Sequence, residues 1–198
     1  MTTALLIVAA YLIGSIPFGV IVGKMRGFDP RAAGSGNIGM TNIARVGGSS
    51  AAALTFVGDV LKGAIPVAAA RLMGYAPAIL AWVALAAFIG AIASVFLGFR
   101  GGKGISAALG VWVVLAPIAL LFALAAFGIT VATTRIVSLG SIIAAIVLVP
   151  AVAALSMPRA YILLAIVMSA LALIRHRENI RRLAAGEEKR FEVRRKAG

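Results

Sequence analysis

The chain alternates between long apolar runs and short polar segments, and this pattern predicts a helical membrane protein. The apolar runs cover residues 3–23, 51–73, 78–98, 105–134, 136–157 and 161–174. About 20 consecutive apolar residues suffice to cross the hydrocarbon core of a bilayer as a helix. The first run follows a start without Lys or Arg, so it lacks the basic region of a cleavable signal peptide and is expected to remain as a membrane helix.

The run 105–134 is too long for one ordinary span, and Pro117 lies near its middle. Proline removes a backbone donor and breaks or kinks a helix, so a division there gives about seven spans. With the N-terminus outside, sixteen Lys and Arg residues then fall on one side and only Arg71 and Arg159 on the other, with Lys62 inside a span. Because loops rich in Lys and Arg face the cytoplasm, we predict an all-α integral membrane fold with a cytoplasmic C-terminus.

Composition supports a single polytopic membrane domain over 1–198, with a basic tail from about residue 175. Hydrophobic residues make up 62% of the chain and charged residues 13%, whereas soluble domains are about one quarter charged. The net charge of +13 alone would suit nucleic acid. The basic residues flank apolar spans, however, so we expect membrane lipids with anionic headgroups as partners and no nucleic acid. One His, six acids and no Cys argue against a metal site.

The first polar segment combines glycines with hydroxyl and amide side chains: Gly34-Ser35-Gly36-Asn37-Ile38-Gly39-Met40-Thr41-Asn42-Ile43-Ala44-Arg45. Glycine lets backbone amides approach a ligand closely, and Ser, Asn and Thr add side-chain hydrogen bonds. Arg45 adds a planar fork of donors suited to phosphate or carboxylate. A solvated connecting loop is the alternative, but it would not need so many of these residues. We therefore predict a binding loop.

The second polar segment, Phe99-Arg100-Gly101-Gly102-Lys103-Gly104, opens the next apolar run. Glycines before a helix N-terminus expose backbone amides to an anion, the helix dipole adds partial positive charge, and Lys103 adds a full charge. A Walker A loop would need Gly at 97 and Ser or Thr at 104, where this chain has Leu97 and Gly104. A plain turn is the alternative. The phosphate of a small substrate fits the segment better than a nucleotide does.

The third polar segment, 176–188, starts at the expected cytoplasmic end of the last span. His176 is the only histidine, and histidine is the side chain whose ordinary pKa lies closest to neutrality. A lone His is more often structural than catalytic, so both roles stay open. His176 and Asn179 lie within one helical turn, so both can face a shared site. Beyond the segment, we interpret Arg194, Arg195 and Lys196 as a basic anchor.

Four further polar residues lie within apolar runs or at their edges. Asp59 and Lys62 are three residues apart and can pair on a helix. Charges inside a membrane usually face a protein interior or a water-filled cavity, so a structural ion pair and a supporting role at a site both stay open. Ser138 and Ser141 lie one turn apart at the expected cytoplasmic boundary, where they either extend a polar pocket or cap and pack the helix.

These segments, in this order, resemble those of the bacterial acyl-phosphate:glycerol-3-phosphate acyltransferases, small membrane enzymes that start phospholipid synthesis. The resemblance covers essentially the whole chain and is carried by 34–45, 101–104 and the pattern His-Arg-x-Asn-Ile-x-Arg-Leu-x-x-Gly-x-Glu at 176–188. It implies seven spans, an outside N-terminus and an active site on the cytoplasmic face of a bacterial cell (inner) membrane. The implied enzyme transfers a fatty acyl group from acyl phosphate to the 1-hydroxyl of glycerol 3-phosphate, releasing 1-acylglycerol 3-phosphate and phosphate. We expect a monomer without a cofactor.

The resemblance also implies roles for single residues: Ser35, Asn37 and Arg45 at the acyl phosphate, Gly102, Lys103 and Gly104 at a substrate phosphate, and His176 and Asn179 with Glu188 as a structural acid. Together with the residue patterns, it predicts the catalytic residues Ser35, Arg45, Lys103, His176 and Asn179. The predicted substrate-binding residues are Gly34, Gly36, Asn37, Thr41, Asn42, Gly101, Gly102, Gly104 and Ser141. The predicted supporting residues are Asp59, Lys62 and Glu188, and no metal ligand is expected.

Two positions depart from the family pattern. Met40 stands where a small residue is usual, which we expect to tighten packing. Ser106-Ala107 replaces a more usual Ala-Thr order, so a hydroxyl role at position 107 is not expected.

Phosphate is a good leaving group, so the implied reaction needs positioning and electrostatic stabilisation more than a covalent nucleophile. The hydroxyl proton could pass to His176 or to a phosphate oxygen of the substrate. We favour the substrate, because no carboxylate is placed beside His176 to form a triad. An acyl-enzyme on Ser35 is the covalent alternative.

Other classes of function fit the sequence less well. A transporter of an anionic metabolite would rest on Asp59, Lys62 and the broken helix near Pro117, but the polar segments gather on one face and do not line a path to the midplane. A lipid-binding scaffold would leave the two glycine-rich segments without a purpose. Acyl transfer by a His-x-x-x-x-Asp motif is excluded, because Arg181 stands at the Asp position.

Overall fold

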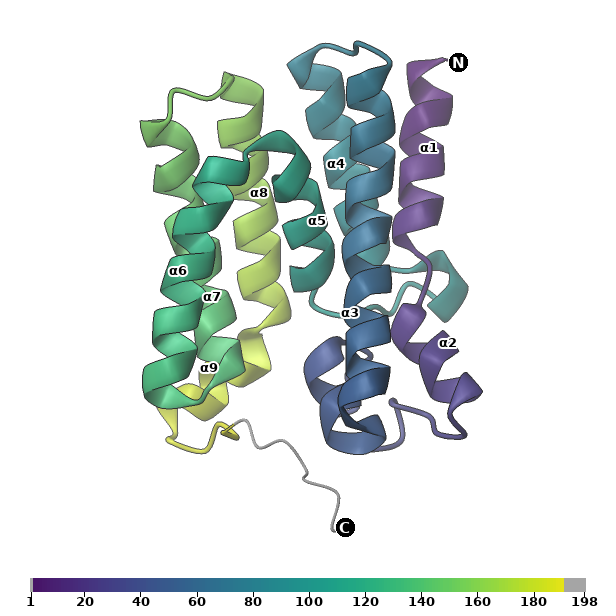
Figure 1. The fold of residues 1–198 in the computed structure, drawn as a ribbon, viewed down its shortest axis with the longest axis vertical. Helices are drawn as coiled ribbons and strands as arrows, with labels where there is room; N and C mark the ends of the chain where they lie inside the picture. The colour runs from purple at the N-terminus through teal and green to yellow at the C-terminus, as the bar shows by residue number, and fades with distance from the viewer. Residues whose placement is uncertain (1, 191–198) are drawn as a thin grey trace.

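The structure, a computed structural model, describes residues 2–190, and all regular structure in that range is helical (Figure 1). The elements are α1 (Thr3–Gly14), α2 (Phe18–Met25), α3 (Met40–Leu72), α4 (Pro77–Ile92), the 3-10 turn η1 (Val95–Leu97), α5 (Ile105–Leu115), α6 (Pro117–Thr134), α7 (Val137–Ala154), α8 (Arg159–Arg175) and α9 (Arg177–Ala184).

Successive long helices run in alternate directions, so their connections gather at two opposite ends of a bundle (Figure 1). One end carries the α3–α4, α5–α6 and α7–α8 turns. The other end, which we call the basic end, carries the α2–α3, α4–α5 and α6–α7 connections and α9. By their places in these elements, Arg71 and Arg159 lie at the first end, and the other described Lys and Arg residues outside the helix interiors lie at the basic end. Arg194, Arg195 and Lys196, which were interpreted as a basic anchor, lie outside the described residues. The arrangement reproduces the charge separation predicted from the sequence.

The long apolar run 105–134 is divided where the sequence predicted. Ala116 has a non-helical backbone (φ −150°, ψ 68°) and Pro117 is the first residue of α6. Proline suits this first helical position, because its fixed φ matches the helix and its missing N–H would lack a partner there anyway. The chain reverses direction at this point (Figure 1), so the predicted helix break is confirmed.

Five helical stretches among the described residues are long and apolar enough to cross a membrane. They are Thr3–Met25, Met40–Leu72, Pro77–Leu97, Pro117–Thr134 and Val137–Ala154. The pair Arg159–Arg175 and Arg177–Ala184, bent by 61°, forms a sixth if it is counted as one span, and Ile105–Leu115 is apolar but shorter. Seven helical segments therefore match the seven predicted runs, whereas seven full spans remain a prediction.

The first apolar run contains a break that the sequence analysis did not expect. Between α1 and α2, the Ser15 carbonyl accepts a hydrogen bond from Ser94 Oγ at 2.6 Å, and the Ile16 carbonyl accepts one from Lys62 Nζ at 3.1 Å. Lys62 also pairs with Asp59 at 2.6 Å, and both side chains are largely buried. The predicted ion pair is thus present, and its lysine also donates a hydrogen bond to a backbone carbonyl at the helix break.

Small residues bring the helices of the bundle close together. An added Cβ at Gly63 would lie 2.1 Å from the Ala107 carbonyl oxygen, and one at Gly110 would lie 2.0 Å from the Val60 carbonyl oxygen. Close packing of this kind is how helices associate in a bilayer, where lipid tails remove the hydrophobic drive between them. It fixes α5, and with it the segment that precedes α5, against α3.

The first polar segment is only partly a loop. Helix α3 begins at Met40, so the segment's second half is helical, and the helix kinks at Gly48 (φ 81°). Ile43 and Ala44 are buried in a small apolar cluster with Val22, against which Met40 packs. This burial stabilises a helix in a stretch whose many polar residues had suggested a loop. The contact of Met40 with the cluster agrees with the packing role expected of this residue.

Candidate functional site

A cavity of about 640 Å³ lies at the basic end and extends between α5, α6, α7 and α8. Its polar part is lined by residues of all three polar segments. Its apolar part continues toward the middle of the bundle and is lined by residues such as Trp112, Leu120, Phe127, Leu148 and Met168. One cavity thus offers a charged mouth to a polar group and an apolar extension to an aliphatic one.

The loop 34–39 is shaped by Asn42, which α3 presents from its first turn. Asn42 is 2% exposed, and its Nδ2 donates to the carbonyls of Pro30, Ala33 and Asn37 at 2.8–3.1 Å. Its Oδ1 accepts the N–H of Ser35 at 2.8 Å. The amide is therefore fully occupied by the loop's own backbone. Asn42 was predicted to bind substrate, but these contacts give it the geometry of a loop organiser.

The loop before α5, residues 98–104, packs directly beside the first segment. An added Cβ at Gly102 would lie 3.6 Å from Ile38 and 3.7 Å from Asn37 Oδ1. Gly104 has φ +78°, and a Cβ there would lie 2.5 Å from the Phe88 ring, so this position requires glycine. No side chain caps α5, which leaves the first-turn N–H groups beside the cavity free to meet an anion.

His176 joins α8 to α9 and is 2% exposed. Its Nδ1 lies 2.7 Å from the Ala172 carbonyl oxygen, so Nδ1 carries the proton and Nε2 keeps its lone pair. Burial, helped by the nearby Lys103 charge, lowers the pKa of His176 from 6.5 to about 4. The imidazole is therefore neutral at neutral pH.

Glu188 connects α7 and α9 at the mouth of the cavity. Its Oε1 accepts hydrogen bonds from Ser138 Oγ at 2.7 Å and Asn179 Nδ2 at 2.6 Å, and its Oε2 accepts one from Arg182 Nε at 2.6 Å. Burial raises the pKa of Glu188, but these three donors outweigh it and hold the pKa below the ordinary value. We call this arrangement the Glu188 clasp. Its geometry agrees with the structural role expected of this acid.

Two cations face the cavity with no partner fixed to them. The side chains of Arg45 and Lys103 form no hydrogen bond or ion pair within residues 2–190, and both residues line the cavity. Burial lowers the pKa of Lys103 to about 8, partly offset by the negative charge of Glu188. The lysine is still mostly charged at pH 7. An unpaired, partly desolvated cation attracts an anion more strongly than a solvated one.

The structure brings together nearly all the predicted site residues. All five predicted catalytic residues line the cavity, as do the three supporting residues and seven of the nine predicted substrate-binding residues. Gly36 and Gly101 do not line it. The N–H of Gly36 is bonded to the Ala33 carbonyl within its own turn, and a Cβ at Gly101 would collide with the backbone of Ala91 and Ile92. Both glycines are therefore needed for the backbone conformation and packing of their loops.

Other contacts at the site were not predicted. Arg182 belongs to the Glu188 clasp and lines the cavity. Arg175 holds the glycine loop by its carbonyls. The sequence analysis gave neither residue a role: Arg175 was counted only as a basic residue of the tail, and Arg182 stands in the pattern at 176–188 without a role of its own. Ser106 and Ala107 both line the cavity, so a hydroxyl at position 106 is available where position 107 has none.

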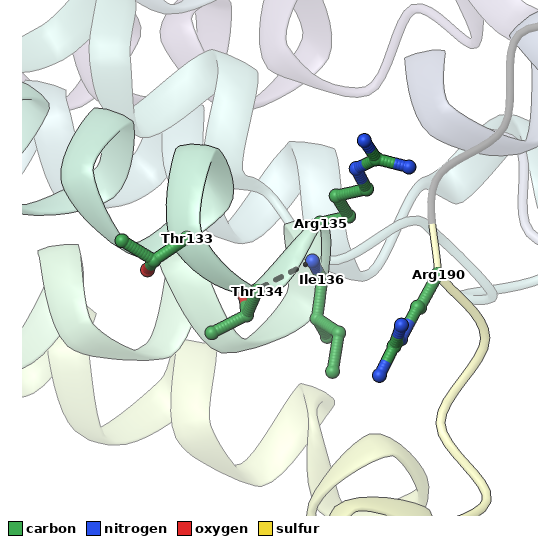
Figure 2. A pocket seen from close by; sticks show the side chains of 5 residues that line it. All are labelled: Thr133, Thr134, Arg135, Ile136 and Arg190. Carbon is green, nitrogen blue, oxygen red and sulfur yellow. Dashed lines mark hydrogen bonds between the residues drawn. The ribbon is translucent and has the colours of Figure 1, made fainter.

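A second hollow of about 420 Å³ lies at the α6–α7 turn, lined by Thr133, Thr134, Arg135, Ile136 and Arg190 (Figure 2). Both Thr hydroxyls donate to carbonyls of α6, and Thr134 Oγ1 also accepts the Ile136 N–H. Figure 2 shows the two guanidinium groups pointing to different sides. No set of donors converges in this hollow, so the larger cavity is the candidate site.

Comparison with known proteins gives a consistent result. Residues 4–186 match the family model described as glycerol-3-phosphate acyltransferase. A glycerol-3-phosphate acyltransferase of Geobacter sulfurreducens is 47% identical over 189 residues, which is 96% of this chain and 97% of the relative. The enzyme of the same name from Trichlorobacter lovleyi is 49% identical over 195 residues, which is 98% of this chain and all of the relative.

Two solved structures are also similar over almost their whole length. They are crystal structures of PlsY (YgiH), an integral membrane glycerol 3-phosphate acyltransferase, in a glycerol 3-phosphate form and a lysophosphatidic acid form. Each is 40% identical and covers 96% of both chains, with TM-scores of 0.91 and 0.90.

Proposed function

This chain belongs to the glycerol-3-phosphate acyltransferase family, and we propose that it transfers a fatty acyl group from acyl phosphate to the 1-hydroxyl of glycerol 3-phosphate. The products are 1-acylglycerol 3-phosphate and inorganic phosphate. The similar crystal structures with glycerol 3-phosphate and lysophosphatidic acid support this acceptor and this product. The acyl-phosphate donor is our proposal from the chemistry of the site.

The single observation that carries the proposal is the composition of the cavity. Its polar mouth holds two unpaired cations, Arg45 and Lys103, beside the uncapped start of α5. Its apolar extension runs between α5, α6, α7 and α8. A site for two phosphate groups and one alkyl chain needs these two surfaces joined, and both belong to this one cavity.

We place the basic end on the cytoplasmic side of the bacterial inner membrane. Among the described residues, the alternation of helix direction separates thirteen Lys and Arg residues from Arg71 and Arg159, and positive charge concentrates on cytoplasmic loops. Seven spans with the N-terminus outside follow from this arrangement, with the short α5 as one of them. We further propose that membrane lipids surround the bundle and that the functional unit is a monomer, because the five predicted catalytic residues all line one cavity of a single chain.

In the proposed reaction, the 1-hydroxyl oxygen of glycerol 3-phosphate attacks the acyl carbonyl. The new ester bond forms as the carbonyl–phosphate bond breaks, and the hydroxyl proton leaves with the phosphate. Lys103 and the start of α5 hold the phosphate of glycerol 3-phosphate. Arg45 and Ser35, which also line the cavity, stabilise the phosphate group of the acyl phosphate and the oxyanion that develops on its carbonyl. Placing the two anionic substrates side by side requires these positive charges.

The substrate's own phosphate is the better proton acceptor. His176 has a pKa lowered to about 4 by burial, so its Nε2 is a weaker base than an ordinary imidazole. A phosphate oxygen has a pKa of about 6 and leaves with the proton as part of the product. We therefore assign His176 to hydrogen bonding within the site and the proton to the departing phosphate.

A covalent acyl-enzyme on Ser35 has less support. An attacking serine needs an adjacent base within hydrogen-bond reach. Within residues 2–190, the only bond of Ser35 at the site is its backbone N–H to Asn42. Ser35 is placed to donate a hydrogen bond and not to lose its proton.

Transport of an anionic metabolite is not supported, because the chain matches acyltransferases along its length. The Asp59–Lys62 pair, on which that hypothesis rested, is bonded to the backbone at a helix break.

The test of the proposed function uses purified protein in sealed vesicles with labelled glycerol 3-phosphate and palmitoyl phosphate. Our proposal predicts labelled lysophosphatidic acid and stoichiometric phosphate. Label that accumulates unmodified inside the vesicles, without acylated product, would instead establish transport.

A further inference from the structure

Arg175, the last residue of α8, holds the glycine loop with two hydrogen bonds. Its Nη2 donates to the Gly101 carbonyl at 2.7 Å, and its Nε donates to the Gly102 carbonyl at 3.2 Å. Arg175 is half-buried and does not line the cavity. The guanidinium therefore lies behind the loop, where it contacts the loop's carbonyls and not a substrate.

These two bonds fix the peptide planes on both sides of Gly102. The Gly101–Gly102 peptide is held at both ends, because its N–H donates to the Ala91 carbonyl at 3.1 Å while its carbonyl accepts from Arg175. The carbonyl of the next peptide, Gly102–Lys103, accepts the hydrogen bond from Arg175 Nε. A trans peptide points its C=O and N–H in opposite directions, so the Lys103 N–H is turned away from α8. Within residues 2–190 this N–H has no acceptor, and Lys103 lines the cavity.

Arginine is suited to this task in a way that lysine is not. The guanidinium is a rigid planar fork whose separate N–H groups can meet two carbonyls at once, whereas an ammonium on a flexible stem acts as a point charge. Hydrogen bonds from a charged donor are also stronger than neutral ones. The fork holds two successive carbonyls of a glycine-rich loop that would otherwise have many backbone conformations.

We propose that Arg175 is a positioning residue for glycerol 3-phosphate: it locks the glycine loop so that the Lys103 amide and the start of α5 face the substrate's phosphate. This inference rests on the proposed function. It assigns the residue to one substrate and not to the other, because the proposed function places the acceptor's phosphate at Lys103 and the start of α5. If the two Arg175 hydrogen bonds merely stabilised the bundle, their loss would change the KM for both substrates equally.

The test compares Arg175→Met and Arg175→Lys with Arg177→Met. The control removes the same charge two residues away, at an exposed side chain that forms no hydrogen bond or ion pair in the described part of the chain. If Arg175→Met lowers the population of the competent loop to about a tenth, the apparent affinity for glycerol 3-phosphate falls about tenfold. We expect that rise in KM for glycerol 3-phosphate, an unchanged KM for palmitoyl phosphate, a smaller rise in Arg175→Lys, and wild-type values in Arg177→Met.

A folded Arg175→Met protein with the wild-type KM for glycerol 3-phosphate, or with equal rises in both KM values, overturns the inference. If this variant does not fold, Arg175→Lys decides, and a wild-type KM in that protein also overturns it. Hydrogen exchange of the peptide 99–105 gives a readout that needs no turnover. We expect faster exchange in Arg175→Met, and exchange as slow as in the wild type overturns the inference. Wild-type protein without phosphate release dependent on glycerol 3-phosphate would instead refute the proposed function.

Discussion

Acidification should destabilise this protein through His176, by an amount that the structure allows us to work out. The pKa of His176 is lowered from 6.5 to about 4, chiefly by burial. In the unfolded chain the imidazole takes up a proton as the pH falls below 6.5, whereas the folded protein keeps it neutral until about pH 4. Protons therefore favour the unfolded state in this window, and stability falls as the pH falls.

The full effect is about 3 kcal/mol, because one pKa unit corresponds to 1.36 kcal/mol. About 2 kcal/mol of it should appear between pH 7 and pH 4.5. Other groups also titrate in this range, so the measurement is a difference between the wild type and His176→Asn. An asparagine amide can keep the bond to the Ala172 carbonyl and does not titrate.

The assay is equilibrium unfolding in mixed micelles at several pH values between 7 and 4.5, followed by the fluorescence of Trp82 and Trp112. We expect the wild type to lose about 2 kcal/mol more than His176→Asn over that range. Equal losses in the two proteins would refute the reasoning, since they would mean that His176 is protonated in the folded state as easily as in the unfolded one.

Three further predictions follow from the same contacts. Glu188→Gln keeps the shape of the clasp but removes its charge, so it should lower the free energy of unfolding by about 1–3 kcal/mol in a denaturant titration above pH 6. Because the pKa of Glu188 is lowered in the folded protein, this loss should shrink as acidification protonates the wild-type carboxyl, and a loss of the same size at every pH at which both proteins fold would contradict the charge argument. Asn42→Ala leaves three carbonyls and one N–H without their partner and should unfold the loop 34–39, with protease cleavage there and a loss of about 3 kcal/mol; a fully protected loop would argue against Asn42 as its organiser. For Lys103, kcat/KM for glycerol 3-phosphate should fall as the pH rises through about 8, and Lys103→Arg should remove this alkaline limb; the same limb in both proteins would assign it to another group.

The sequence predicted the helices well where covalent geometry or burial acts locally. Pro117 ends one helix and starts another wherever it stands in an apolar run, so its effect could be predicted without a fold. The break at Ser15–Ile16 could not, because it is stabilised by Ser94 and Lys62, which are far away along the chain. A helix break that depends on distant donors leaves no local signal in the pattern of apolar residues.

The same distinction applies to the site. The three polar segments predicted which residue types would meet, and the cavity brings them together. The partners within the site were not predictable, since Glu188 reaches Ser138 and Arg175 reaches Gly101 only through the packing of α8 and α7 beside the glycine loop. For Asn42, residue type pointed to ligand binding, while burial assigned the amide to its own loop.

The measurement that tests the central claim most directly is the initial rate of phosphate release from palmitoyl phosphate by the purified protein, with and without glycerol 3-phosphate. Arg45→Ala and Lys103→Ala are measured beside it, with Arg26→Ala as a control that removes a charge at the basic end but outside the cavity. Our account predicts release that requires glycerol 3-phosphate, collapses in the two cavity variants and is unchanged in the control. Phosphate release that does not depend on glycerol 3-phosphate, or that continues at the wild-type rate in both cavity variants, would contradict this account.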